Sequence, residues 1–427
     1  MNTLLLATLL SASRVLTLDE ALETARQHQP SLRQAQADVR AAQARVTQAR
    51  APLLPQLNVS ARYSLGTSNL VPQQGLVVDP TMGGTSPSSS PVTNFTNGSV
   101  TLSQLIWDFG QTWNRFQAAQ FNADAASQDA QTRLNTVVFG VRSAFFSALA
   151  AKELLVVAKE TLANQERHFG QVQGFVEVGT RPAIDLAQAR TDRANARVQL
   201  ISAQNGYASA KAALNQAMGV EGPTDFDVSG DRLGAVQEEN RPLAEVVDVA
   251  LSNRPEVEAL ASRLRAQQEL VTAARGAYGP SLSLQTAASG GGRDTRLSGN
   301  VTVFGLSMSW NLFNGLGDWA RVQEAEANVT SLSAQVDALR QQVRLELEQA
   351  QLGVSAAVES AAATDEALQA ARERLKLAEG RYETGVGNII ELGDAQLALT
   401  NAAAQQVRAD FNVSTARAQL LRTLGQP

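Results

Sequence analysis

The stretch RYETGVGNIIELGD, residues 381–394, decides the architecture because a related stretch occurs earlier in the chain. Residues 175–188 read FVEVGTRPAIDLAQ, and the two stretches share a glutamate, a glycine, and an isoleucine–acid–leucine triplet, 206 positions apart. In each, a glycine ends one amphipathic run shortly before another begins, which is typical of a helix end followed by a return helix. The two stretches therefore predict two helical hairpins.

The similarity extends outward from these stretches to most of the chain. An offset of 206 relates Trp113 to Trp319 and runs without a gap to the C-terminal end, while an offset of 225 relates Pro55 to Pro280. Agreement at constant offsets over such lengths is the signature of an internal duplication. We therefore expect two repeats, residues 14–218 and 243–427, joined by a linker at 219–242.

The change of offset makes the first repeat about 19 residues longer, and the extra residues fall in Gly66–Gly98. This stretch is rich in Gly, Pro, Ser, Thr and Asn, a composition that predicts an exposed loop.

Each repeat is expected to contain a helix, two strands and a long helical hairpin, in that order. Apolar or small residues spaced three and four apart, as in residues 32–49, predict a coiled-coil helix before the strands. Residues 111–176 contain no proline and would form a helix of about 100 Å at ~1.5 Å per residue, with a return helix ending near Met218.

Alternating apolar and polar residues predict the strands. They lie at about 56–66, 97–109, 281–290 and 299–312. The run Gly290-Gly291-Gly292 is interpreted as a hairpin turn. It is not interpreted as a phosphate loop, because no Lys-Ser/Thr follows it. Alternation alone does not distinguish a lipid-facing strand from a strand of a soluble sandwich.

Composition excludes several classes of function. The 427 residues include no cysteine and two histidines, which excludes thiolate metal sites and cysteine nucleophiles and disfavours a histidine metal cluster. The net charge of −5 has the wrong sign for general nucleic-acid binding. No constellation of catalytic residues is found, so we expect no enzyme, cofactor, metal or nucleic-acid partner.

The N-terminal residues 1–13 contain a short apolar run followed by small residues, which predicts a signal peptide. The first basic residue, Arg14, follows the apolar run instead of preceding it. The alternative is a frayed terminus or a wrongly chosen start codon.

Four strands per chain limit the ways in which the protein could cross a membrane. Such a sheet cannot close in lipid, because its edges would leave backbone groups unpaired. Two chains would supply eight strands and a filled barrel, whereas three would supply twelve, the smallest symmetric assembly with room for a passage.

These features together resemble the TolC-like outer-membrane efflux protein family. The resemblance rests on the duplicated plan, the junctions Leu54-Pro55-Gln56-Leu57 and Gly279-Pro280-Ser281-Leu282, and the stretch 381–392. It implies a mostly α fold with a small β part, in which long antiparallel coiled-coil hairpins and four membrane strands per chain complete a 12-stranded β-barrel and an α-helical barrel as a homotrimer. It further implies a passive exit duct in the outer membrane of a Gram-negative bacterium, docked on a periplasmic adaptor and an inner-membrane pump.

The resemblance also implies roles for residues of the hairpins. Adaptor contact is expected at Gly179, Thr180, Gly385 and Val386, although glycine at these places also suits a helix C-terminus. A channel constriction is expected from rings of Glu391 and Asp394, although Asn388 and Glu391 have the spacing of a helix cap. Gate contacts are expected from Asp185, Tyr382 and Arg181. The family's arginine two residues beyond the second hairpin glycine is replaced by Gly387, and Arg181 occupies that register in the first repeat.

The tryptophans fall near the predicted strand–helix junctions: Trp107, Trp113, Trp310 and Trp319. An aromatic belt at the membrane interface would explain them, and ordinary packing is the alternative. The function expected from the sequence is thus a trimeric outer-membrane duct in contact with lipid. The alternative of a different class is a wholly periplasmic coiled-coil scaffold.

Overall fold

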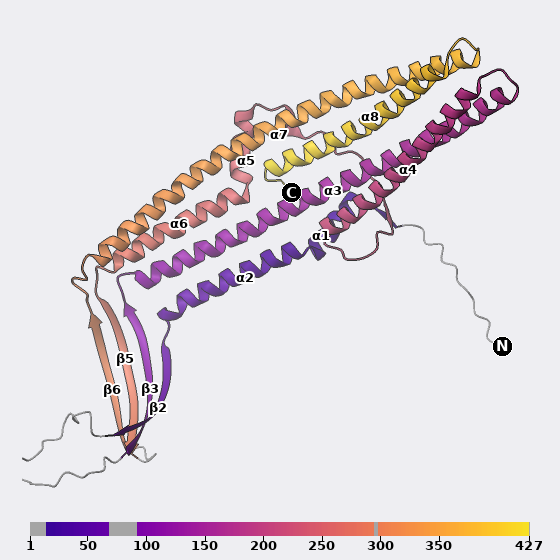
Figure 1. Ribbon diagram of the computed structural model, residues 1–427. Coiled ribbons are helices and arrows are strands. Elements are labelled where there is room, and N and C mark those ends of the chain that lie inside the picture. Colours follow the sequence, from indigo (N-terminus) through magenta and orange to yellow (C-terminus); the bar gives the residue numbers. More distant parts are fainter. Residues whose placement is uncertain (1–13, 68–91, 294–297, 427) are drawn as a thin grey trace, which may run out of the picture. The chain divides into compact units, whose positions relative to one another are not determined.

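The computed structural model describes residues 14–67, 92–293 and 298–426, so the expected signal peptide lies outside the described residues. The helices are α1 (Leu18–His28), α2 (Pro30–Arg50), α3 (Gln111–Glu177), α4 (Ala183–Met218), α5 (Leu243–Asn253), α6 (Pro255–Gly276), α7 (Gly317–Glu383) and α8 (Ile389–Thr423). The strands are β1 (Arg14–Leu16), β2 (Gln56–Thr67), β3 (Val92–Trp107), β4 (Phe226–Val228), β5 (Ser281–Arg293) and β6 (Ser298–Ser309). Short 3₁₀ helices occur at Ala51–Leu53 and Gln237–Asn240. The expected mostly helical fold with a small β part is confirmed (Figure 1).

The chain divides into two compact units. One unit consists of Arg40–Ala126 and Leu260–Ala334, and it contains the four long strands. The other unit combines the described residues up to Val39 with Ser127–Ala259 and the residues from Gln335 onward, and it contains the ends of the two helical hairpins. Both units draw on both halves of the sequence.

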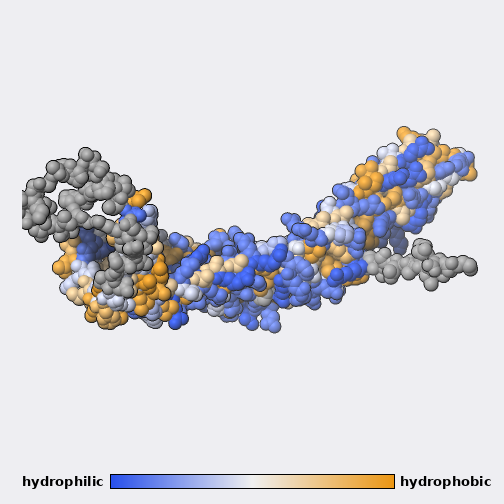
Figure 2. Space-filling view, turned by 90° about the horizontal axis from the view of Figure 1, so that it is seen from below, coloured by the Kyte–Doolittle hydropathy of each residue, from blue (hydrophilic) through white to orange (hydrophobic). Residues whose placement is uncertain are grey.

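The four long strands form one antiparallel sheet in the order β2-β3-β5-β6 (Figure 1). Alternation sorts the side chains onto two faces, as expected for a pleated sheet. One face carries exposed Leu57, Val59, Leu102 and Leu306, and hydrophobic surface is visible over the strands in Figure 2. The other face carries serine ladders, in which the hydroxyl groups of Ser60 and Ser99, and of Ser283 and Ser307, are each 2.8 Å apart.

The strand boundaries correct two expectations. β3 begins at Val92, so only part of Gly66–Gly98 is a loop; residues 68–91 lie outside the described residues. The strand continues because the β2–β3 ladder continues, with Phe95 opposite Ser64. The interpretation of Gly290-Gly291-Gly292 as a turn is wrong: the glycines lie within β5. The Phe95 ring covers this part of β5, and a Cβ on Gly291 would be 3.2 Å from it.

The long helices have the predicted extent. α3 and α7 each contain 67 residues, and each is followed by a return helix, α4 or α8. Among the described residues, α3 is the one helix whose length and composition would suit a membrane span. Its apolar residues Val141, Phe145 and Phe146 are instead fully buried in the core with Leu214 of α4. A core helix of a soluble protein can have the same length and apolar composition.

The C-terminal end of each return helix packs on the corner before α2 or α6. Gly219 follows α4 with φ +72° and Gly425 follows α8 with φ +74°, the left-handed conformation that favours glycine. The Gln29 amide donates to the carbonyl of Ala217 at 2.8 Å, and the Arg254 guanidinium donates to the carbonyl of Thr423 at 2.6 Å. The two corners are therefore built alike, at positions related by the two sequence offsets.

Replacing Gly219 by alanine is expected to destabilise the protein more than the same change at Gly179. Both glycines have positive φ, which costs a residue with a Cβ about 1–2 kcal/mol. A Cβ at Gly219 would also stand 2.6 Å from the Gln29 Cα, whereas at Gly179 it would meet nothing within 4 Å. Thermal unfolding of the purified protein would measure the difference. Equal losses of stability in the two variants would contradict a close approach of the backbone at Gly219.

The segment between α4 and α5 is anchored to the helices at several points. β4 pairs in parallel with β1, and this small sheet was not predicted from the sequence. Asp227 of β4 accepts hydrogen bonds from Lys152 at 2.8 Å and from Tyr207 at 2.5 Å. Burial, followed by this hydrogen bond, raises the pKa of Tyr207 to about 12. The phenol therefore remains a hydrogen-bond donor at neutral pH.

Candidate functional site

The candidate site consists of the ends of the two helical hairpins and the helices just behind them. The first hairpin turns at Gly179, with φ +75°, and the Thr180 N–H donates to the Phe175 carbonyl at 2.9 Å. The second turns at Gly385, with φ +81°, and the Val386 N–H donates to the Arg381 carbonyl at 3.1 Å. Both bonds span six residues, as in a Schellman cap. The glycines thus have the capping role that was the alternative to adaptor contact.

The turns expose apolar side chains. Val178 and Ile184 of the first hairpin, and Val386 and Ile390 of the second, are among the most exposed large hydrophobic residues in the described chain. Exposed apolar side chains at two adjacent turns are typical of a surface that meets a partner. Adaptor contact at these turns therefore stays a prediction.

A cluster around Tyr382, here called the tip cluster, joins the two hairpins. It consists of Tyr382, His168, Phe175, Arg181 and Asp185. The Tyr382 ring is packed by the rings of His168 and Phe175, with centroids 5.5 and 6.5 Å away, and by the Arg181 guanidinium at 4.4 Å. Arg181 also donates to the Tyr382 carbonyl at 2.8 Å and to the Gly387 carbonyl at 3.5 Å. Arg181 therefore connects the first hairpin to both sides of the second turn.

The structure brings the expected gate residues together but not through the hydroxyl group. Tyr382 and Asp185 are 3% and 6% exposed, respectively. The buried Tyr382 hydroxyl has no partner of acceptable hydrogen-bond geometry among the described residues. Burial, followed by the charge of Asp185, raises the pKa of Tyr382. The two groups are thus electrostatic neighbours, and the ring and backbone of Tyr382 make the connection.

His168 is a member of the tip cluster that the sequence did not single out. It is 7% exposed, and burial lowers its pKa, although nearby Asp192 and a hydrogen bond that the imidazole donates to Gln171 oppose the shift. A neutral imidazole is the form that this environment favours. A lone histidine in a helix gave no signal of such a position.

The two candidate constriction acids have different surroundings. The Glu391 backbone N–H is capped by the Asn388 side chain at 2.7 Å, and the Glu391 carboxylate is 3.1 Å from the Arg381 guanidinium. Asp394, one helical turn further along α8, is exposed. Glu391 therefore has the helix-cap role that was the alternative to the constriction, and Arg381 partly neutralises its charge. This ion pair was not predictable from the sequence, because the distance from Arg381 to Glu391 depends on the shape of the turn.

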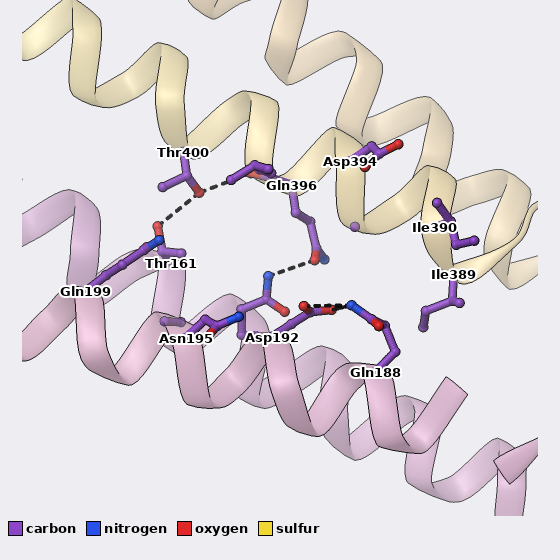
Figure 3. Close-up of a pocket in the computed structure, with 14 residues that line it drawn as sticks. Thr161, Gln188, Asp192, Asn195, Gln199, Ile389, Ile390, Asp394, Gln396 and Thr400 are labelled. Atoms are coloured by element: carbon purple, nitrogen blue, oxygen red, sulfur yellow. Dashed lines mark hydrogen bonds between the residues drawn. The ribbon is translucent and has the colours of Figure 1, made fainter. Parts of the chain in front are cut away.

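A polar groove of about 370 Å³ lies behind the turns, between α4 and α8 with one side formed by α3 (Figure 3). Gln165 donates to Gln396 at 2.8 Å, and the hydroxyls of Thr161 and Thr400 are 3.4 Å apart, so two polar contacts cross between the hairpins. On α4, Gln188 points toward Asp192 and donates to it at 3.0 Å (Figure 3). Amide and hydroxyl groups at such a seam hydrogen-bond to each other or to water. These polar residues were not identified from the sequence.

The four tryptophans lie in the unit that contains the sheet. Trp107 ends β3, Trp310 follows β6, and Trp113 and Trp319 lie in the first turns of α3 and α7. All four are more than half exposed. Their exposure disfavours ordinary packing within one chain, and an interfacial role stays a prediction. Among the described residues, no group of histidine and acidic side chains could hold a metal ion.

Comparison with known proteins identifies the family. The model of the outer membrane efflux protein family matches residues 21–220 and 246–426. The chain belongs to the outer membrane efflux protein family. The matched residues include both helical hairpins and the four long strands.

The chain is also similar to several individual proteins. Protein CyaE of Bordetella pertussis is 29% identical over 323 residues, 74% of this chain and 64% of the relative. The probable efflux pump outer membrane protein SepC of Pseudomonas putida is 30% identical over 194 residues, 44% of this chain and 39% of the relative. The matched regions thus span less than two thirds of these relatives. A crystal structure of a membrane protein from Pseudomonas aeruginosa shares the fold, with a TM-score of 0.81 at 23% identity, and the alignment covers 97% of this chain and 92% of that chain.

Proposed function

We propose that three copies of this chain form an outer-membrane duct that serves as the passive exit of a tripartite efflux or export system. The observation that carries the proposal is the four-stranded sheet of an outer membrane efflux family member, in which β2 and β6 are edges and one face is apolar and exposed. Edges left open in lipid would have unpaired backbone groups. Closure by other copies of the chain satisfies these groups.

Three copies would bring twelve strands, enough for a barrel with a passage. The apolar face would then contact lipid and the serine ladders would face the interior, the alternation of a membrane barrel. The exposed tryptophans would lie at the periplasmic interface of the outer membrane.

The duplicated organisation belongs to the same proposal. It is supported by the two regions of the family match, by helices of equal length in both halves, and by the similar corners at Gly219 and Gly425. Two similar repeats per chain would give a trimer six nearly equivalent helical hairpins.

The partners follow from this arrangement. The exposed apolar turns would meet a periplasmic adaptor, which would connect the duct to an inner-membrane pump. The alternative, a wholly periplasmic scaffold, would leave the apolar face of the sheet in water.

Two measurements test the proposal. Native mass spectrometry of the detergent-extracted protein should give three chains, and reconstituted protein should conduct ions across planar bilayers. A freely soluble protein in cell fractionation, or a stable monomer in detergent, would contradict the duct and favour the scaffold.

Replacing Asp394 by asparagine is expected to lower the cation selectivity of the duct more than replacing Glu391 by glutamine. Both acids would form rings at the narrow end, but Glu391 is partly neutralised by Arg381 at 3.1 Å. Reversal potentials across a salt gradient, and block by trivalent cations from the periplasmic side, would measure the effect. Glu23→Gln, at an exposed position of α1, provides a control of equal charge. Unchanged selectivity in both tip variants would show that the acids do not line the constriction.

A further inference from the structure

The two β-hairpins of the sheet have the same register, which establishes how the two halves of the chain correspond in space. Leu57 pairs with Leu102 in the first hairpin. The residues 225 and 206 positions later, Leu282 and Met308, pair in the second. The same two offsets convert Gln56–Ser103 into Ser281–Ser309, Val59–Val100 into Leu284–Leu306, and Ser60–Ser99 into Gln285–Gly305.

The contact between the hairpins is the β3–β5 ladder, in which Val100 pairs with Ala288 and Thr101 pairs with Ala287. It joins the last strand of the first hairpin to the first strand of the second. The equivalent contact from the second hairpin back to a first hairpin would join β6 to β2. Within one chain these strands are the two opposite edges of the sheet, separated by β3 and β5, so they cannot meet. The contact requires another copy.

We propose that β6 of one copy pairs antiparallel with β2 of the next copy, in the register that places Leu306 opposite Tyr63 and Ser307 opposite Arg62. This register is the β3–β5 register carried over by the two offsets. The proposal rests on the proposed homotrimer and specifies how its chains join.

The residues along the transferred register support it. Apolar side chains meet apolar ones at three rungs: Phe304–Leu65, Leu306–Tyr63 and Met308–Ala61. Polar or small residues meet at the rungs between them, where Ser307 faces Arg62 and Gly305 faces Ser64. A shift by one residue would place polar residues opposite apolar ones and mismatch both faces of the sheet. The register therefore continues the apolar face from one copy to the next.

The connections next to these strands supply independent support. Phe109, after β3, lies directly over Gly279, before β5; a Cβ on Gly279 would be 2.1 Å from the Phe109 ring. The corresponding residues of the other contact are Gly315, after β6, and Leu54, before β2. The large and the small residue exchange places between the two contacts. Within the chain, Phe109 after the strand meets Gly279 before the next strand, whereas between chains Gly315 after the strand would meet Leu54 before the next strand.

The backbone and exposure at these positions agree with this exchange. Phe109 and Gly315 both have positive φ, +53° and +67°, so the two turns have related conformations. In the single chain, a Cβ on Gly315 would meet nothing within 4 Å, and Leu54 is 48% exposed. Both positions are therefore uncovered until another copy arrives.

Disulfide cross-linking tests the register, because the natural chain has no cysteine and each introduced pair is the only one that can form. We would compare Tyr63→Cys/Leu306→Cys with Arg62→Cys/Ser307→Cys, one pair on each face, since only one face of an antiparallel ladder has the closer pairs. The parent pairs Val100→Cys/Ala288→Cys and Thr101→Cys/Ala287→Cys form the matched controls within the chain. They show which face forms disulfides readily.

One of the two control pairs should form a disulfide within the chain. The intermolecular pair on the same face should then give a covalent trimer on denaturing gels, and reductant should abolish it. The shifted pair Tyr63→Cys/Phe304→Cys should not cross-link, because diagonal neighbours at about 7–8 Å are too far apart. Cross-linking of the shifted pair in a native trimer would overturn the register and leave the duct standing. Absence of any trimer by native mass spectrometry would instead overturn the proposed function, and this proposal with it.

Exchange of the large and small residues provides the second test. Gly315→Phe should greatly reduce the trimer fraction, because the ring would overlap Leu54 of the next copy. Gly315→Phe with Leu54→Gly recreates the Phe109–Gly279 contact and should restore the trimer. A normal trimer with Gly315→Phe alone, or failure of the double variant to recover, would overturn the size exchange.

Discussion

Replacing Arg254 by methionine is expected to lower the stability of the helical unit by about 3 kcal/mol, the lower end of the range for breaking a buried ion pair. The Arg254 side chain is 3% exposed. Its guanidinium donates to the Thr423 carbonyl at 2.6 Å and to Glu346 at 2.8 Å, and lies 3.4 Å from Glu256. Methionine fills the space but leaves the carbonyl and the carboxylates without their donor. The lower end applies because both glutamates are partly exposed to water.

A second variant separates the hydrogen bond from the charge. Arg254→Gln reproduces the corner before α2, where Gln29 donates to the carbonyl of Ala217. Glutamine should therefore retain the contact with Thr423 and lose only the ion pairs, with a smaller decrease in the thermal unfolding midpoint. If methionine and glutamine destabilise equally, the backbone hydrogen bond contributes little at this corner.

Arg254→Met should also change the pH dependence of stability. Burial alone would raise the pKa of Glu346, but hydrogen bonds from Gln342 and Arg254 outweigh burial and hold this pKa below its usual value. A carboxylate with a depressed pKa stabilises the fold above its unfolded pKa, and this stabilisation is lost as the pH falls through the folded pKa. The difference between natural protein and Arg254→Met should thus shrink on acidification. Unfolding midpoints measured at pH 7 and pH 4 would show it.

The long helices and the sheet could be predicted because their signals are periodic and extend over many residues. The proline-free run after residue 111 and the alternation around Leu57 and Leu306 each repeat one geometric requirement many times. β1 and β4 were missed because strands of three residues contain no usable period. Gly290-Gly291-Gly292 was misread because glycine is typical of turns, whereas here the run lies within β5 and Gly291 lies under the Phe95 ring of β3.

The candidate site was predictable only as far as one helix or one turn determines it. The turn glycines and the cap on Glu391 depend on neighbouring residues, so their local geometry followed from the sequence. The Arg381–Glu391 pair depends on the path of the turn, and the contacts of His168 and Arg181 with Tyr382 cross between hairpins about 200 positions apart in sequence. The resemblance indicated that Tyr382 and Asp185 belong together, but not that Arg181 makes the hydrogen bonds. The gate role of all three residues stays a prediction.

Replacing Arg181 by alanine is expected to open the narrow end of the duct and increase its single-channel conductance several-fold. Arg181 is the side chain that hydrogen-bonds to the second hairpin on both sides of its turn, at the Tyr382 and Gly387 carbonyls, and it also stacks on the Tyr382 ring. Alanine removes both donors and the stacking at once. No other side chain of the tip cluster makes comparable hydrogen bonds between the two turns of a chain. If the hairpin ends close the duct, losing Arg181 should therefore release them.

Two further variants distinguish this connection from the tyrosine–aspartate contact that the family resemblance implies. Tyr382→Phe should leave the conductance nearly unchanged, because the hydroxyl has no hydrogen-bond partner among the described residues, while the ring and the backbone carbonyl remain. Arg181→Lys should be intermediate, since lysine keeps the charge but lacks the planar fork that reaches two carbonyls. Conductance in planar bilayers, together with entry of large antibiotics into intact cells, would measure all three. A large increase with Tyr382→Phe and none with Arg181→Ala would show that the hydroxyl contact with Asp185 closes the duct and that Arg181 only caps the turn.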